Sequence, residues 1–240
     1  MIVTSSQSAF LYNSPSASNE DSADKAQPLS RSRRNIGEPA RYWPQNSTIK
    51  IAIYECDKDD EYVLAVKKAA SEWLPHINLK FEFVSGNEGD VRIAQNPSND
   101  SEGNSAVGTQ ALDKNPAYPT MELPWDHKHP RFAYIVMHEF GHMLGAHHAH
   151  QHPDADIPWD MEKIKRIPGS NKQEAERNLL PLPRSSKYHF MPYDGESVMH
   201  YEIDSAFTHR GWAQSESWAL SDGDIAWAKK TYPKAISAIS

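Results

Sequence analysis

The sequence predicts an α+β fold, in which strands and two long helices form the first half of the folded region and loops fill most of the second half. Three observations lead to this class. Short segments with the alternating apolar pattern of β-strands recur between residues 48 and 125. Apolar residues recur at helical spacing in two longer segments, 60–77 and 130–146. Beyond them, regular patterns return only at 171–180 and 221–232.

Residues 1–38 differ in composition from the rest of the chain. They are rich in Ser, Asn, Asp, Ala and Gln, and they include the basic cluster SRSRR at residues 30–34. Such a segment buries too little apolar surface to offset the conformational entropy lost on ordering it. We therefore expect a disordered leader, either a pro-segment or a secretion segment, ahead of one main domain at 39–240.

The first half of this domain alternates strands with helices. Residues 48–55 have the alternation of a strand, and residues 60–77 space Val63 and Val66 along one helical face until Pro75 ends the helix. Four more strands are expected at 79–84, 90–94, 105–112 and 119–125.

Two of the remaining helices carry clear end signals. The segment 130–146 has a proline at its start and Gly145 near its end, which are the residues favoured at these positions of a helix. The last helix, 221–232, opens with Ser221 and Asp224 in the pattern of a capping box. Both segments are therefore expected to be helical over most of their length.

The charge and hydropathy of the chain exclude some classes of partner. The formal net charge of −7 argues against nucleic acid or an anionic membrane as the main partner. No apolar run approaches the roughly 18 to 20 residues that span a bilayer, and the leader lacks the charged start and apolar stretch of a classical signal peptide. We expect no membrane insertion, a monomer, and export by another route, for example as a delivered bacterial effector.

Cysteine usage limits the chemistry of any metal site. Cys56 is the only cysteine in the sequence. One thiol can form neither an intrachain disulfide nor a thiolate zinc cluster. A metal site in this chain must therefore use His, Asp or Glu.

Six histidines lie between residues 138 and 152. His138 and His142 are four residues apart, so in a helix their imidazoles lie on one face, about one turn apart, and can bind one ion. Glu139 lies at the edge of that face, where its carboxylate can take a proton from a water activated by the metal. This is the arrangement that a zinc hydrolase needs.

A catalytic zinc site needs a third protein ligand. Gly145 can adopt a positive φ and redirect the chain, which brings His148 back towards the ion. The full spacing of these residues is the H-E-x-x-H-x-x-G-x-x-H pattern of the metzincin zinc peptidases, and it predicts one catalytic Zn²⁺ held by His138, His142 and His148. The alternative is a histidine-rich helix that binds metal loosely, with Glu139 as a helix former.

The stretch SVMHY at residues 197–201 resembles the methionine-containing turn of the astacin family of metzincins. The resemblance implies that Met199 supports the zinc ligands from beneath. It also implies that Tyr201 is a labile fifth zinc ligand, which swings to hydrogen-bond the tetrahedral intermediate. The alternatives are a core methionine and a buried tyrosine bonded to the backbone.

The resemblance to astacins extends from RYWP at residues 41–44 to residue 233. It implies the metzincin fold: a twisted, mostly parallel five-stranded sheet with two long helices, an active-site cleft, and a loop-rich C-terminal subdomain with the Met-turn and a final helix. The subdomains would span about 39–147 and about 148–240. One position departs from the family, because Ala149 stands where astacins have the Glu that supports their matured N-terminus. Activation by a freed N-terminus is therefore not carried over to this chain.

These observations predict a zinc metalloendopeptidase. Glu139 would deprotonate the attacking water and pass the proton to the leaving amine, while zinc and Tyr201 would stabilise the oxyanion. A protein or peptide substrate is expected to lie extended along the edge of the N-terminal sheet, beside residues 105–111. Two other functions remain open: a catalytically weak zinc-bearing effector or toxin module that acts by binding a partner, and a zinc amidase.

Overall fold

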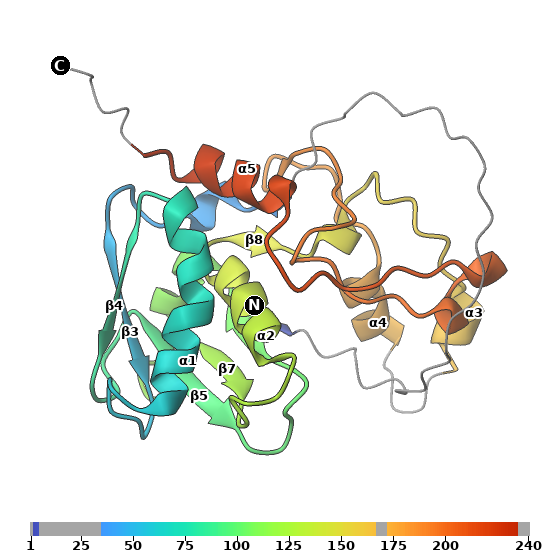
Figure 1. The fold of residues 1–240 in the computed structure, drawn as a ribbon. Helices are drawn as coiled ribbons and strands as arrows, with labels where there is room; N and C mark the ends of the chain where they lie inside the picture. The colour runs from blue at the N-terminus through green and yellow to red at the C-terminus, as the bar shows by residue number, and fades with distance from the viewer. Residues whose placement is uncertain (1, 5–34, 167–171, 235–240) are drawn as a thin grey trace, which may run out of the picture.

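A computed structural model of the chain describes residues 2–4, 35–166 and 172–234. A twisted sheet packs against two helices, and a region of loops and short helices lies beside them (Figure 1). The strands are β1 (Ile2–Thr4), β2 (Ile36–Gly37), β3 (Thr48–Ile53), β4 (Lys80–Val84), β5 (Val91–Asn96), β6 (Asn104–Ala106), β7 (Met121–Pro124), β8 (Ala146–His147) and β9 (His189–Phe190). The α-helices are α1 (Glu61–Ala70), α2 (Phe132–Met143), α3 (Met161–Ile164), α4 (Lys172–Leu179) and α5 (Asp222–Thr231).

The main sheet has the strand order β1-β6-β7-β5-β3-β4. Strands β4, β3, β5 and β7 are parallel, whereas β6 is antiparallel to β7 and β1 is antiparallel to β6. The predicted mostly parallel sheet of five strands is thus confirmed for β3 to β7. The short β1 adds a sixth strand at the β6 edge, which the sequence did not predict.

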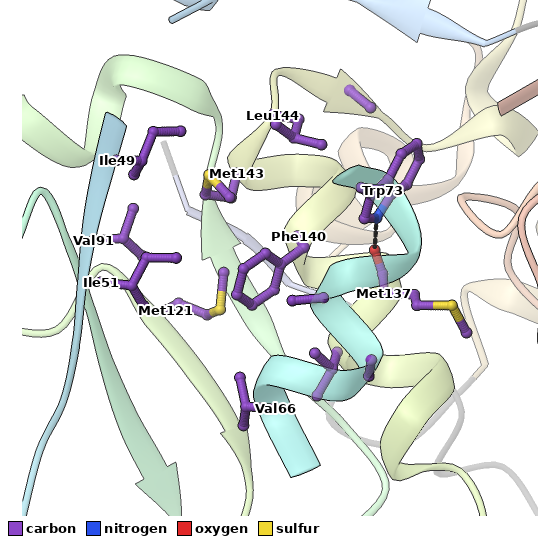
Figure 2. Close-up of a cluster of buried hydrophobic side chains, with 14 of the residues drawn as sticks. Ile49, Ile51, Val66, Trp73, Val91, Met121, Met137, Phe140, Met143 and Leu144 are labelled. Atoms are coloured by element: carbon purple, nitrogen blue, oxygen red, sulfur yellow. Dashed lines mark hydrogen bonds between the residues drawn. The ribbon is translucent and has the colours of Figure 1, made fainter. Parts of the chain in front are cut away.

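The main core lies between this sheet and the helices α1 and α2. Ile51 and Val91 of adjacent parallel strands point towards Phe140 of α2, as Figure 2 shows. The Trp73 indole N–H donates to the Met137 carbonyl at 3.0 Å, which ties the segment after α1 to α2. Burying such side chains stabilises the fold by roughly 1.5–3 kcal/mol each, so this core fixes the position of α2.

One predicted strand was wrong over most of its length. The segment expected to be extended at 105–112 is a strand only at Asn104–Ala106 and becomes a 3₁₀ helix at Gly108–Asp113. Gly108 has φ +51°, and a side chain there would collide with the Arg41 carbonyl. The chain turns at this glycine because it passes against the Arg41 backbone, a contact between distant segments.

The end signals of the last helix are confirmed. Ser221 is the N-cap of α5, its hydroxyl accepts from the Asp224 N–H at 3.0 Å, and the Asp224 carboxylate accepts from the Ser221 N–H at 2.8 Å. The helix expected at 60–77 ends earlier than Pro75. Helix α1 ends at Ala70, and the chain continues as a 3₁₀ helix, Ser71–His76, which contains Pro75.

A small second sheet lies next to the carboxyl end of α2. Its order is β8-β2-β9, with β2 antiparallel to both neighbours. The middle strand, Ile36–Gly37, begins before the predicted leader boundary at 38, and most of the predicted leader, 5–34, lies outside the described residues. Because β8 directly precedes His148, this sheet anchors the chain just ahead of the third predicted ligand.

In the part of the chain that the structure describes, no helix is both long enough and apolar enough to cross a membrane.

Candidate metal centre

Three buried histidines converge at the end of α2. His138 and His142 lie on α2, and His148 is the residue before the 3₁₀ helix Ala149–Gln151. One ring nitrogen from each lies within 4.8 Å of the others, and the Nε2 atoms of His142 and His148 are 3.0 Å apart. The structure thus brings together the three residues that the sequence spacing singled out.

The other ring nitrogens of the two helical histidines contact backbone carbonyls. His138 Nδ1 lies 2.8 Å from the Val198 oxygen, and His142 Nδ1 lies 2.8 Å from the Ala146 oxygen. A carbonyl can only accept, so each Nδ1 carries the proton and each Nε2 keeps its lone pair. These contacts fix both the tautomer and the direction of the two imidazoles.

The donor set fits a zinc ion. His138 Nε2 is buried and has no hydrogen-bond partner among the described residues, which is costly unless an ion or water occupies the space. Burial lowers the pKa of His138 to about 4 and lowers the pKa of His142 and His148 well below their usual value. Three neutral imidazoles with an open fourth position are a donor set of catalytic zinc.

Gly145 makes the turn between the second and third histidines. Its φ of +99° lies in the left-handed region that favours glycine. A side chain at this position would also come within 2.7 Å of the Tyr42 ring. Both the backbone angle and the close packing therefore require glycine here, as the spacing argument expected for the turn.

Met199 packs against α2 at Gly141, between His138 and His142. It is fully buried, and a side chain at Gly141 would collide with the Met199 sulfur. The Met199 carbonyl also accepts from the Ala149 N–H at 2.9 Å, next to His148. Sequence reasoning missed Gly141, although a glycine inside a helix, which costs about 1 kcal/mol relative to alanine, is a signal of close packing.

Glu139 and Tyr201 lie beside the triad. Both are buried, and together with His138 they line a small cavity. The Tyr201 ring lies 4.1 Å from the His148 ring, centroid to centroid. Burial, reinforced by the charge of Glu139, raises the pKa of Tyr201 well above its usual value, so its hydroxyl stays protonated and can donate.

The remaining histidines of the region make other contacts. His147 lies 2.9 Å from the Glu38 carboxylate, and His200 lies 2.9 Å from the Tyr193 hydroxyl. His150 donates to the Asn178 carbonyl, but its ring also stacks on Tyr201 at 4.5 Å. The sequence spacing took only His138, His142 and His148 as ligands, and it did not predict that His150 packs against the site.

A buried carboxylate on α5 supports the site from behind. Asp224 accepts from the Val198 N–H at 2.8 Å and from the Ser197 hydroxyl at 2.6 Å, and from the side-chain amide of Asn35. Val198 links this carboxylate to the triad, because its N–H donates to Asp224 and its carbonyl orients His138. Sequence reasoning gave Asp224 only a capping role, since no local signal links it to residues so far away in the chain.

We expect the metal-free protein to lose stability as the pH falls from 7 to 5. Burial lowers the pKa of His138 to about 4, whereas in the unfolded chain it stays near 6.5. Between these values the unfolded chain binds more protons, so the contribution to stability is fully present above about 6.5 and is lost towards lower pH. Urea unfolding with a chelator measures the effect; an unchanged midpoint at the two pH values would contradict it.

Comparison with known proteins agrees with this geometry. The sequence model of the astacin family of peptidases matches residues 35–215. Two curated proteins of Caenorhabditis elegans, zinc metalloproteinases nas-3 and nas-2, are each 33% identical over 87 and 88 residues. These stretches are 36% and 37% of this chain and 25% of each relative, so the chain spans about a quarter of the length of the curated relatives it matches.

Solved structures match over a larger share of this chain than the curated relatives do. The structure of myroilysin has a TM-score of 0.76 at 30% identity, covering 84% of this chain and 100% of that one. High choriolytic enzyme 1, a hatching enzyme zinc-protease of medaka (Oryzias latipes), has a TM-score of 0.54 at 18% identity over 79% of this chain and 93% of its own, which is a likeness of fold alone. The predicted resemblance is confirmed, and since the family match covers most of the sequence and includes the three converging histidines, the chain belongs to the astacin family.

Proposed function

We propose that the chain is a zinc-dependent endopeptidase that hydrolyses peptide bonds of a protein or peptide substrate. The observation that carries the proposal is the convergence of three buried, neutral imidazoles beside the buried carboxylate of Glu139. Neither a structural metal site nor a binding module needs a carboxylate beside the open position. Membership of a peptidase family supports the same reading.

His138, His142 and His148 would hold the ion. When bound, zinc polarises the carbonyl of the substrate and lowers the pKa of water in its open position. The backbone contacts of His138 and His142 keep their lone pairs directed at one point. Gly145 and Met199 support this arrangement, one by turning the chain and the other by packing beneath α2.

Glu139 would act as general base and then as general acid. Its carboxylate lines a small cavity with His138 and Tyr201 and is fully buried. It would take a proton from the attacking water and give it to the amine that leaves. Because the two steps use one carboxylate, no second titrating group is required.

Tyr201 would donate a hydrogen bond to the oxyanion. Its raised pKa keeps the phenol protonated at neutral pH, and a donor aimed at developing charge in a buried site is worth several kcal/mol in typical enzymes. The stack with His150 would hold the ring in its resting position. Replacing Tyr201 by Phe is expected to lower kcat with little change in zinc affinity.

The substrate would bind as an added strand at the edge formed by β6. In the structure this edge already accepts a strand, because Ile2–Thr4 pairs with Asn104–Ala106 in antiparallel register. Backbone pairing of this kind accepts many sequences, as an endopeptidase requires. The available edge is shorter than the predicted 105–111, since the 3₁₀ helix at Gly108–Asp113 ends it.

Deleting Ile2–Thr4 is expected to lower the KM for peptide substrates several-fold while leaving kcat unchanged, because the segment occupies the edge that the substrate would need. Steady-state kinetics on the full chain and on the deletion variant test this. A length-matched control replaces the three residues with glycine, which weakens strand pairing without shortening the chain. An unchanged KM in both variants would rule out competition between this segment and substrate.

The proposed function is tested by digestion of a peptide library with mass-spectrometric detection. Internal cleavage that is blocked by a chelator and restored by zinc is expected. Cleavage of small amides alone would identify a zinc amidase, and no hydrolysis of either would favour the effector module that acts by binding.

The organisation of the whole protein follows the same proposal. Residues 1–38 would be a pro-segment or secretion segment ahead of a catalytic domain at 39–240. We propose that the chain is exported and acts as a monomer. Running full-length and leader-deleted protein in the same library digest tests whether the leader restrains activity.

A further inference from the structure

His150 is a fully buried histidine that packs against the triad but is not one of its three members. Its ring stacks on the Tyr201 ring, with the centroids 4.5 Å apart and an angle of 22° between the planes. The ring of His148 lies 5.2 Å away on the same measure, at an angle of 27°. His150 thus contacts both a predicted zinc ligand and the proposed oxyanion donor.

Three imidazoles lie against the Tyr201 ring, with centroid distances of 5.8 Å for His138, 4.1 Å for His148 and 4.5 Å for His150. The first two are predicted to hold the ion, whereas His150 is not. A change at His150 can therefore act on the tyrosine without removing a ligand. Because Tyr201 also lines the cavity beside Glu139, the position of its ring decides where its hydroxyl lies in that cavity.

The end of α4 holds His150 in place. The carbonyls in the last turn of a helix have no partner within the helix, and His150 Nε2 donates to one of them, the Asn178 carbonyl, at 2.8 Å. The next residue, Gln151, donates its side-chain amide to the Arg177 carbonyl at 2.7 Å and to the Leu180 carbonyl at 3.2 Å. Two neighbouring side chains thus bind the end of α4, and the bond to Asn178 fixes the direction of the His150 ring.

Helix α4 is itself anchored in a second, smaller core. Leu179 is buried there with Ile164, and partly buried side chains pack around them: Trp159, Met161 and Phe207. This core belongs to the loop-rich half of the molecule, where Figure 1 shows α3 and α4. The direction of the His150 ring is therefore set by a part of the molecule that contains none of the three predicted ligands.

We infer that His150 is a positioning residue for Tyr201: held by the end of α4, it fixes the tyrosine ring so that the hydroxyl is directed into the cavity when the oxyanion forms. The inference rests on the proposed function and adds a residue to it. A buried stack of two aromatic rings favours one arrangement by about two- to tenfold. A donor is effective when it is already aimed at the charge that develops, so His150 acts on kcat rather than on KM.

Two substitutions separate the stack from the bond to α4. His150→Phe keeps an aromatic ring against Tyr201 and loses the N–H that reaches the Asn178 carbonyl, whereas His150→Gln keeps an N–H donor and loses the ring. His150→Leu also removes the planar ring, and it replaces the Gln variant if that protein does not fold. The matched control is His152→Gln, because His152 is buried in the same segment but packs on Phe190 instead.

The kinetic test compares kcat, KM and zinc content on one cleaved peptide. His150→Gln is expected to lower kcat about two- to tenfold with KM and zinc content unchanged, His150→Phe to keep more of kcat than His150→Gln, and His152→Gln to match the wild type. A double variant shows whether the effect passes through Tyr201: in a Tyr201→Phe background, which lacks the hydroxyl, His150→Gln should lower kcat no further. An equal loss in both backgrounds, or wild-type kcat in His150→Gln, overturns the inference.

A second measurement does not depend on catalysis. NMR of the metal-free protein with ¹³C-labelled tyrosine rings measures how fast the Tyr201 ring flips, and Tyr201→Phe identifies its signals. The flip rate is expected to rise several-fold in His150→Gln and to stay near the wild-type rate in His150→Phe, and one common rate in all three proteins overturns the inference. Failure of the proposed function would look different, since the wild type would then cut no peptide while the flip rates still differed.

Discussion

Glu139→Gln is expected to leave one zinc ion bound and to lower kcat by about 10²- to 10⁴-fold, the range typical of losing a general base. The change keeps the size of the buried side chain and removes its ability to take a proton. The three imidazoles and their backbone contacts do not involve Glu139, so zinc binding should persist. Zinc content by elemental analysis and kcat on a cleaved peptide measure the two effects separately.

The matched control for this variant is Glu202→Gln. Glu202 follows Tyr201 in the chain, but its side chain is exposed rather than buried beside the triad. We expect it to keep kcat close to that of the wild type. A Glu139→Gln protein with most of the wild-type rate would remove Glu139 from its proposed role, and one that also lost zinc would leave the carboxylate with a structural role instead.

Asp224→Ala is expected to destabilise the fold by several kcal/mol, because each buried donor left without its acceptor costs about 1–3 kcal/mol. Its carboxylate is fully buried and accepts from Ser197, Val198, Ser221 and Asn35. Truncation leaves these donors without their acceptor in a buried setting. Urea unfolding of the metal-free and zinc-loaded proteins measures the loss.

The same variant is expected to weaken zinc binding, because Asp224 positions the turn whose Val198 carbonyl orients His138. Loss of such a supporting contact typically costs about 10- to 100-fold in metal affinity. Asp222→Ala is the control, since Asp222 is exposed in the same first turn of α5. If both variants unfold at the same urea concentration and bind zinc equally, the carboxylate network does not support the site.

The residues that sequence reasoning identified are those whose geometry is local. His138 and His142 are set by the pitch of one helix, and Gly145 turns the chain within three residues, so their convergence with His148 follows from spacing alone. The alternation of the parallel strands is likewise local, and four of the five predicted strands were confirmed closely in position.

The residues that sequence reasoning missed depend on contacts between distant segments. His150 and Asn178 are 28 positions apart, and Asp224 and Val198 are 26 positions apart. A histidine or a capping residue gives no sign in the sequence of which partner the fold will bring to it. The error at Gly108 has the same origin, since the turn there depends on the Arg41 backbone.

The most direct test of the central claim is to add zinc to the metal-free protein and follow peptide cleavage against zinc bound. If His138, His142 and His148 hold the single catalytic ion, the rate should rise in proportion to bound zinc and stop rising at one equivalent. A protein that binds one equivalent and cuts no peptide bond, or one that cuts peptides equally well without metal, would contradict the proposed function.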